Sequence, residues 1–221
     1  MNMRRKQLVG LLLSLLTLSL ASGCVRYARW DDGWKGKPIG KYRLTVYWLA
    51  HQRHYRGPRR GLLMHRGRLM KRVPLRFVRA LRMQGSGRLR NGRIVQVLRR
   101  CRWKRHCVHV RLISSRRYPS GVGAAGRPLR PFRSVAADTR FAFGTKLYIP
   151  RLRRLLRRRG RTHNGCFVVH DRGGRIRGAR LDLFTGNRVL YRRYLRGRLP
   201  RFVRVYRYHP RCRRSHRYAR R

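Results

Sequence analysis

The segment His163–Gly186, HNGCFVVHDRGGRIRGARLDLFTG, combines two apolar runs with two of the chain's five acidic residues. The apolar run Cys166–His170 ends at Asp171, and the alternating run Ala179–Phe184 contains Asp182. Short runs rich in β-branched and aromatic residues predict strands, and the Gly-Gly pair between them predicts a turn. We therefore expect this turn to bring Asp171 and Asp182 onto neighbouring strands.

Acidic residues are so rare in this chain that their positions carry information. The 221 residues include 61 Lys and Arg, giving a formal net charge of +56, and there is no glutamate. The acids are Asp31, Asp32, Asp138, Asp171 and Asp182. A calcium loop with a bidentate Glu, a zinc-protease helix with a Glu base and a glycosidase with a Glu pair are therefore excluded. Asp138 ends a further apolar run, Phe132–Asp138, so three of the five acids lie at or beside the end of an apolar run.

The remainder of the chain is predicted to be mainly β, because short strand-like runs alternate with Gly-rich breaks. The other predicted strands are Tyr42–Trp48, Leu75–Val78, Arg93–Leu98, Val108–Ser114, Lys146–Ile149 and Phe202–Tyr208. Many short strands with frequent turns favour a small β-barrel with one or two short helices. A helix is predicted near Asn187–Leu195, whereas Arg151–Arg159 fits a helix and an Arg-rich loop equally well.

The stretch Gly121–Gly126, GVGAAG, matches the GxGxxG pattern of dinucleotide-binding folds. That pattern functions when its last glycine opens a helix whose N-terminus holds the pyrophosphate. Pro128 and Pro131 follow shortly, so no such helix is expected here. We expect instead a loop that packs closely against another segment of the chain.

The N-terminus has the organisation of an export signal. Three basic residues precede the apolar run Leu8–Ala21, whose fourteen residues fall short of the roughly 20 that a spanning helix needs. Small residues then lead to Cys24, which resembles a bacterial lipoprotein signal with a signal peptide over 1–23, lipid on Cys24 and a tether over 24–41. Val25 after this cysteine implies sorting to the outer membrane. The alternatives are an ordinary signal peptide with an incidental cysteine and a short uncleaved anchor.

Export changes the partners that the charge implies. Strong positive charge usually indicates nucleic acid or an anionic surface, but an exported chain meets lipopolysaccharide, anionic lipid and cell wall instead. A lipid anchor and a basic surface together give stable membrane attachment. The Arg-rich segment 209–221 is predicted to be a solvated tail. Nucleic acid is therefore not an expected partner, and the oligomeric state stays open.

Four cysteines follow the predicted lipidation site: Cys101, Cys107, Cys166 and Cys212. An even number in an oxidising compartment favours disulfides, with three possible pairings, or free buried thiols. Zinc is the alternative, because histidines lie near all four cysteines in sequence. None of these positions has the CxxC spacing of a structural zinc site, so no metal is expected.

The segments Gly121–Pro150 and His163–Gly186 resemble the three-aspartate (3D) domain, which also forms the catalytic region of membrane-bound lytic transglycosylase A. The step of eleven residues from Asp171 to Asp182, with its glycine pair, is the most specific part of the resemblance. Looser similarity extends to the first and last predicted strands. The resemblance therefore covers most of the chain after the tether.

The resemblance implies a double-psi β-barrel over residues 42–208, with its motif core at 120–186. It implies an enzyme that cleaves the β-1,4 bond between N-acetylmuramic acid and N-acetylglucosamine of peptidoglycan, with a 1,6-anhydro product and a role in cell-wall turnover. Asp182 matches the catalytic acid/base of the family, and Asp171 and Asp138 match its supporting aspartates. No metal or organic cofactor is implied. One carboxylic acid suffices for this chemistry, since the 6-hydroxyl of the sugar replaces a second carboxylate nucleophile.

Two features of the sequence keep an alternative open. Arg172 stands where the family usually has Thr or Val, and Arg180 lies two residues before Asp182, so both charges favour the ionised form of the acid. The larger transglycosylase also has a second domain that completes its substrate groove, for which this chain is expected to have no room. The alternative is a non-catalytic lipoprotein that binds the cell wall or polyanions.

Overall fold

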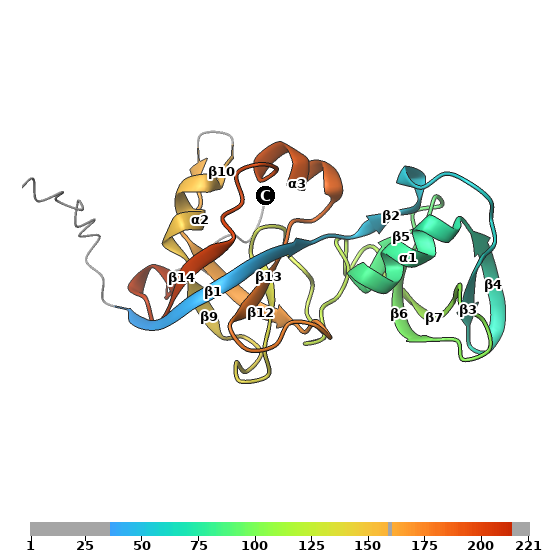
Figure 1. Ribbon diagram of the computed structural model, residues 1–221, viewed down its shortest axis with the longest axis horizontal. Helices are drawn as coiled ribbons and strands as arrows, with labels where there is room; N and C mark the ends of the chain where they lie inside the picture. The colour runs from blue at the N-terminus through green and yellow to red at the C-terminus, as the bar shows by residue number, and fades with distance from the viewer. Residues whose placement is uncertain (1–35, 159–160, 214–221) are drawn as a thin grey trace, which may run out of the picture. The chain divides into compact units, whose positions relative to one another are not determined.

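The computed structural model describes residues 36–158 and 161–213 (Figure 1). The predicted signal peptide 1–23, the lipidation site Cys24, most of the tether and the end of the tail lie outside these residues. Within them the chain is mainly β, as predicted, with three short α-helices. No helix in this described part is both long enough and apolar enough to span a membrane.

Six strands close into a barrel in the order β1-β13-β8-β12-β9-β14. Their bounds are β1 Lys37–Tyr47, β8 Ser134–Ala137, β9 Lys146–Tyr148, β12 Cys166–Asp171, β13 Arg180–Phe184 and β14 Phe202–Arg207. β1 pairs with β13 and β8 with β12 in parallel, and the other four pairs are antiparallel. The strands predicted at the positions of β1, β9, β12, β13 and β14 are confirmed, and β8 lies within the apolar run Phe132–Asp138. The predicted tether is wrong at its end, because β1 already begins at Lys37.

The barrel strands alternate between an apolar core and an outer face. The core contains Leu44, Val135, Ala137, Phe167, Val169, Leu181 and Leu183, together with other large apolar side chains. Successive residues of a strand point to opposite faces, so the residues between these face outward. The outer face of the barrel is therefore the place where polar side chains of the strands can gather.

Residues 50–113 form a second sheet, which corrects the expectation of one barrel over 42–208 with no room for more. Its strand order is β2-β5-β6-β7-β3-β4. The bounds are β2 Ala50–His51, β3 Gly61–His65, β4 Arg68–Val73, β5 Ser86–Arg88, β6 Ile94–Arg100 and β7 Cys107–Ile113. These strands pair with one another and bury an apolar cluster of their own, so they add no strand to the barrel.

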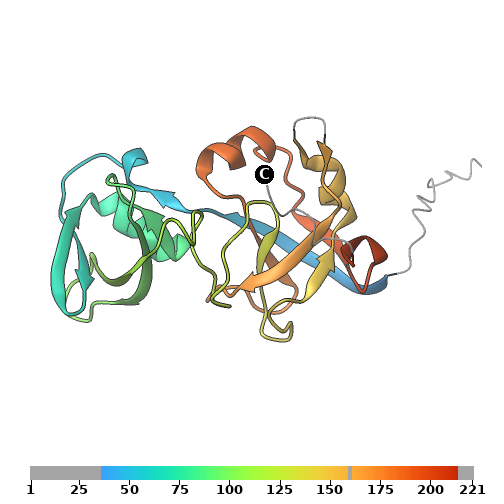
Figure 2. The ribbon, with the colours of Figure 1, turned by 180° about the vertical axis from the view of Figure 1, so that it is seen from behind.

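Helix α1, Leu75–Gln84, packs on this second sheet (Figure 1, and from behind in Figure 2). It corrects the strand predicted at Leu75–Val78. Phe77, Val78 and Leu81 are fully buried at helical spacing, and Gly85 ends the helix in the left-handed region with φ 76°. The run Leu75–Val78 by itself is too short to distinguish a helical from a strand period.

Shorter elements complete the structure: η1 Gln52–His54, α2 Pro150–Leu155, β10 Arg157–Arg158, β11 Arg161–Thr162, α3 Arg188–Tyr194 and η2 Pro210–Cys212. Helix α3 confirms the helix predicted near Asn187–Leu195. It begins after Asn187, whose side chain accepts a hydrogen bond from the Leu190 N–H at 2.9 Å. Helix α2 resolves the choice left open for Arg151–Arg159 in favour of a short helix followed by a strand.

Two disulfides decide among the possible cysteine pairings. Cys101 bonds to Cys107 and Cys166 bonds to Cys212, with Cα–Cα distances of 5.3 and 5.4 Å. The second bond ties the segment after β14 to β12. The predicted tail is therefore wrong over residues 209–213, because this part is ordered around η2.

Candidate active site

Four barrel strands set a row of side chains on the outer face of the barrel. Asp171 on β12 and Asp182 on β13 both have Ala136 of β8 as their register partner, and Asp182 is also the partner of Thr45 on β1. Register partners point to the same face of a sheet, and neighbouring strands lie about 4.8 Å apart. The two carboxyls therefore flank one small, buried side chain. The structure brings Asp171 and Asp182 together, but with β8 between their strands rather than on adjacent strands.

An irregularity in β12 turns Asp171 toward this face. The pairing of β12 with β8 shifts between Val169 and Asp171. Val169 lies in the barrel core, so regular alternation would direct Asp171 into the core as well. The extra residue, His170, restores the outward direction, as β-bulges do beside functional sites.

The glycine-rich loop packs against β12 at this bulge, as expected for GVGAAG. The Ala125 N–H donates to the His170 carbonyl at 3.1 Å, and the Ala124 N–H donates to Asp171 Oδ1 at 2.9 Å. A Cβ on Gly123 would overlap the His170 carbonyl oxygen, so glycine is required for this approach. The glycines thus serve to bring a backbone donor to an aspartate.

Asp182 is a largely buried carboxyl with one close donor. Thr45 Oγ1 donates a hydrogen bond to Asp182 Oδ1 at 2.8 Å. Burial raises the pKa of Asp182 most and repulsion from Asp171 raises it further, whereas the Thr45 hydrogen bond and the charge of Arg180 lower it. The resulting pKa is about 6. Part of the Asp182 population is therefore protonated near neutral pH.

Asp171 is held by three donors. The N–H groups of Ala124 and Arg172 donate to Oδ1 and the Tyr47 hydroxyl donates to Oδ2, each at 2.9 Å. Burial raises the pKa of Asp171, and these bonds to the carboxylate oppose the rise. Burial and the charges of Asp171 and Asp182 raise the pKa of Tyr47 well above its usual value, so its hydroxyl keeps its proton. Asp171 is thus fixed as a hydrogen-bond acceptor beside Asp182.

Asp138, the third predicted aspartate, is placed differently. Its Oδ1 accepts the Arg140 N–H at 3.0 Å, and its Oδ2 accepts the Gly178 N–H at 2.9 Å. These bonds, and the Arg140 guanidinium 3.8 Å away, hold the pKa of Asp138 below its usual range. Gly178 belongs to the turn between β12 and β13. The contacts of Asp138 therefore position that turn, and they do not connect Asp138 to Asp171 or Asp182.

The two arginines expected to oppose proton donation have limited influence on Asp182. Arg172 donates to a backbone carbonyl, and its guanidinium lies 4.1 Å from the centroid of the Phe143 ring. Its charge lowers the pKa of the adjacent Asp171. Arg180 does lower the pKa of Asp182, but burial and the charge of Asp171 outweigh it. The arginine-rich surroundings therefore leave the raised pKa of Asp182 in place.

Sequence reasoning missed three residues of this site: Thr45, Tyr47 and Ala136. Thr45 and Tyr47 occupy alternate positions of a predicted strand, so their shared face was the available signal for both. Nothing in the sequence singles out Ala136, because its role depends on which strands flank β8. Among residues 36–158 and 161–213, no group of three or more His, Cys, Asp or Glu is placed to hold a metal ion.

The arrangement can move a proton. A carboxyl with a pKa of about 6 gives up and regains a proton near neutral pH, and burial, with a smaller contribution from the charge of Asp171, raises the pKa of Asp182 to this value. The Thr45 hydroxyl fixes the direction of the Asp182 side chain. The site is therefore suited to general acid and general base catalysis by one residue.

Asp138, Asp171 and Asp182 lie in a stretch of the chain that matches a known family. Residues 133–207 match the 3D domain family. The crystal structure of E. coli MltA with bound chitohexaose is similar, with a TM-score of 0.50 and 18% identity over 76% of this chain and 71% of that one. The lytic transglycosylase LtgG of Burkholderia pseudomallei has a TM-score of 0.42 and 20% identity, covering 76% and 72% of the two chains. No curated protein matches by sequence. The likeness to MltA shows a shared fold.

Proposed function

We propose that the chain is a lytic transglycosylase acting on the glycan strands of peptidoglycan, and the match of residues 133–207 to the 3D domain family supports this. The barrel would then be of the double-psi type. The MltA structure that shares the fold holds chitohexaose, which supports a glycan as the ligand. The observation that carries the proposal is the Asp182 carboxyl, which has a pKa of about 6 and lies across Ala136 from Asp171.

Asp182 is the acid and the base of the reaction. The protonated carboxyl donates its proton to the oxygen of the β-1,4 bond between N-acetylmuramic acid and N-acetylglucosamine as the bond from C1 to that oxygen breaks. The carboxylate then accepts the proton of the 6-hydroxyl while that oxygen bonds to C1. The product is a 1,6-anhydro sugar, no water is consumed, and Asp182 ends protonated again. This cycle needs a single carboxyl with a pKa close to the working pH, and burial raises the pKa of Asp182 to about 6.

Asp171 and Asp138 support this cycle in different ways. Asp171 stays an acceptor because three donors hold it, and its charge keeps the pKa of Asp182 raised. Asp138 holds the turn between β12 and β13 through the Gly178 N–H, and so sets how the two strands meet β8. Asp171 is therefore the electrostatic partner of Asp182, and Asp138 is a positioning residue.

We propose further that the chain is exported, carries lipid on Cys24 and faces the periplasm from the outer membrane, where the enzyme would serve cell-wall turnover. The order of basic, apolar and small residues before Cys24 supports this placement, and the net charge of +56 supports contact with anionic lipid. Cys24→Ser should release the chain from the membrane fraction. Retention of this variant in the membrane fraction at high salt would contradict lipid attachment.

Digestion of purified sacculi tests the reaction. Wild type should release 1,6-anhydro muropeptides, and Asp182→Asn should reduce their rate of release by about 100-fold or more, the usual contribution of a positioned general acid. Asp138→Asn removes one carboxylate outside the pair and should retain more activity than Asp182→Asn. Sacculi from which wild type releases no anhydro products would rule out the transglycosylase.

The high positive charge favours one alternative, a cell-wall-binding or polyanion-binding lipoprotein without catalysis. Such a protein would bind sacculi equally well with Asp182→Asn and would lose binding at high salt. It would release no anhydro products. Binding and product analysis on the same two proteins therefore separate the alternatives.

A further inference from the structure

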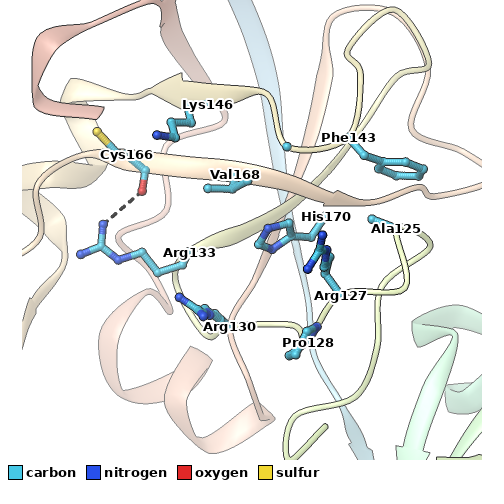
Figure 3. Close-up of a pocket in the computed structure, with 11 residues that line it drawn as sticks. Ala125, Arg127, Pro128, Arg130, Arg133, Phe143, Lys146, Cys166, Val168 and His170 are labelled. Atoms are coloured by element: carbon cyan, nitrogen blue, oxygen red, sulfur yellow. Dashed lines mark hydrogen bonds between the residues drawn. The ribbon is translucent and has the colours of Figure 1, made fainter. Parts of the chain in front are cut away.

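A cavity of about 710 Å³ lies on the outer face of the barrel beside β12 (Figure 3). The β12 side chains that line it are those of Cys166, Val168 and His170, which alternate with the core residues of the strand. Four cationic side chains also line it: Arg127, Arg130, Arg133 and Lys146. They come from the loop before β8 and from the first residue of β9. Two separate segments thus direct positive charge to one concave surface.

Among residues 36–158 and 161–213, no acidic side chain lines this cavity. The aspartates of the same range are held by other donors, Asp182 by Thr45 and Asp138 by the Gly178 N–H. Like charges that line a concave surface produce a strong positive potential there. The cavity therefore favours an anionic ligand.

Two of the lining groups are fixed in place by the protein. The Arg133 guanidinium donates to the Asn164 side chain and, at 3.2 Å, to the Cys166 carbonyl, which Figure 3 marks with a dashed line. His170 Nδ1 shares a hydrogen bond of 2.9 Å with Ser134 Oγ. Burial and the charges of neighbouring arginines lower the pKa of His170, so its ring is neutral at pH 7 and adds no further repulsion. A cation and a neutral hydrogen-bonding ring of the lining are thus each held in place by the protein.

The rest of the lining is mainly apolar. Ala125, Pro128, Phe143 and Val168 contribute it. The Arg172 guanidinium stacks on Phe143 at 4.1 Å from the ring centroid, which fixes that ring at the edge of the cavity. A bare inorganic anion would leave these surfaces without a partner. A ligand with carboxylates and small aliphatic groups, such as a short acidic peptide, would use both kinds of lining.

The cavity adjoins the aspartate pair. His170 lines the cavity and the next residue, Asp171, faces Asp182, because the bulge in β12 directs both outward. The Gly-rich loop also connects the cavity to the aspartate pair, since the Ala124 N–H donates to Asp171 and Ala125 lines the cavity. A polymer whose glycosidic bond lies at Asp182 would therefore carry its side groups toward the four cations.

We propose that this cavity binds the carboxylates of the short acidic peptides attached to the glycan strands, and so holds the glycan in place at Asp182. Arginine guanidinium groups bind carboxylates through two parallel hydrogen bonds, and Arg127 and Arg130 supply such groups. The inference rests on the proposed function, since it takes the glycan strand as the substrate. It adds a second recognition element, the peptide, to a site otherwise defined by the sugar.

Binding of a small probe tests the cavity directly. The probe is the N-acetylated tripeptide Ala-Glu-Ala, with N-acetyl-Ala-Gln-Ala amide as its uncharged counterpart and inorganic phosphate as a non-peptide anion, each titrated into the full chain. Arg127→Gln/Arg130→Gln should weaken Ala-Glu-Ala binding about tenfold, through the loss of charge-assisted hydrogen bonds. The matched control Arg196→Gln/Arg198→Gln removes the same charge from exposed positions outside the cavity and should change binding by less than about twofold. Equal losses in both variants, or phosphate binding as tight as the tripeptide, would overturn the proposal.

Turnover separates this proposal from the proposed function. Glycan strands that carry peptides and strands stripped of them by an amidase are digested with wild type, Arg127→Gln/Arg130→Gln and the control variant. The cavity variant should lower kcat/KM about tenfold on peptide-bearing strands and leave it unchanged on stripped strands. An equal effect on both substrates would overturn the peptide role while leaving the transglycosylase intact. Probe binding at the cavity without cleavage of either substrate would reject the enzyme and confine the proposal to anionic peptide binding.

Discussion

Asp182→Asn should make the folded protein more stable than wild type above about pH 7, even though it removes the proposed catalytic acid. Thr45 Oγ1 donates to Asp182 Oδ1 at 2.8 Å, and the side-chain oxygen of asparagine can accept the same bond. The substitution therefore keeps the local geometry. What it removes is a buried negative charge that is repelled by Asp171.

The size of the effect follows from the raised pKa. The pKa of Asp182 rises from its ordinary value of 3.8 to about 6 on folding, mainly through burial. A carboxyl that binds its proton more tightly in the folded state favours folding at low pH, and this advantage is lost as the pH rises through the folded pKa. At about 1.4 kcal/mol per pH unit, the rise corresponds to about 3 kcal/mol by which ionised Asp182 destabilises the wild type above pH 6. Asparagine is uncharged, so the variant is not destabilised in this way.

Urea unfolding measured from about pH 4 to about pH 8 provides the assay. The stability difference between Asp182→Asn and wild type should approach about 3 kcal/mol at the high end and shrink toward zero as the pH falls to about 4. Asp138→Asn is the matched control with the opposite sign, because the pKa of Asp138 is lowered and its carboxylate stabilises the folded state at neutral pH. A gain for Asp182→Asn that is the same at both ends of the range, or a loss at about pH 8, would refute the reasoning.

Three further outcomes follow from the same geometry. Release of anhydro products should fall about tenfold per pH unit above about pH 6, because protonated Asp182 is the donor, and a flat profile would contradict its role as the acid. Tyr47→Phe removes a donor to the Asp171 carboxylate, so the pKa of Asp171 should rise and that of Asp182 should fall. Titrations followed by the carbon-13 signals of the carboxyls measure both pKa values. Unchanged titration curves would argue against electrostatic coupling between Asp171 and Asp182. Cys212→Ser should lower stability by about 2–4 kcal/mol without reductant, since the disulfide to Cys166 closes a loop. A loss that persists when wild type is also reduced would assign the effect to packing instead.

The fold is predictable where a strand carries a strong local pattern. The alternation of Tyr42–Trp48 and the apolar run Cys166–His170 are recognisable as strands because both depend on residues close together in sequence. The strand predicted at Leu75–Val78 is wrong, since four apolar or basic residues fit either period until Leu81 and Gly85 complete a helical face and its cap. The second sheet escapes prediction for a different reason. Pairing between strands that are far apart in sequence produces no pattern that can be recognised within either strand.

The site is predictable in its acids and not in its neighbours. The rarity of acids in the chain and their positions in or at the end of apolar runs single out Asp138, Asp171 and Asp182 from the sequence alone. The separation of Asp171 and Asp182 by Ala136 is not predictable, because it results from β8 entering between their strands. The sequence predicts that Asp138 supports Asp182 together with Asp171. In the structure, Asp138 instead accepts a hydrogen bond from the Gly178 N–H, in the turn between β12 and β13.

The sequence by itself determined which side chains are present and where they lie along the chain: five acids without glutamate, aspartates in or beside the predicted strands, and glycines at the turns between them. The tertiary structure decided which of these groups act on one another. It paired Cys166 with Cys212, placed the bulge that turns Asp171 outward, and set Thr45 against Asp182. The physical reason is that a pKa depends on the water and charges around a group in space, and residues far apart in the chain supply both. Asp182 is an ordinary aspartate in the sequence, and burial on a barrel wall beside Asp171 is what raises its pKa to about 6.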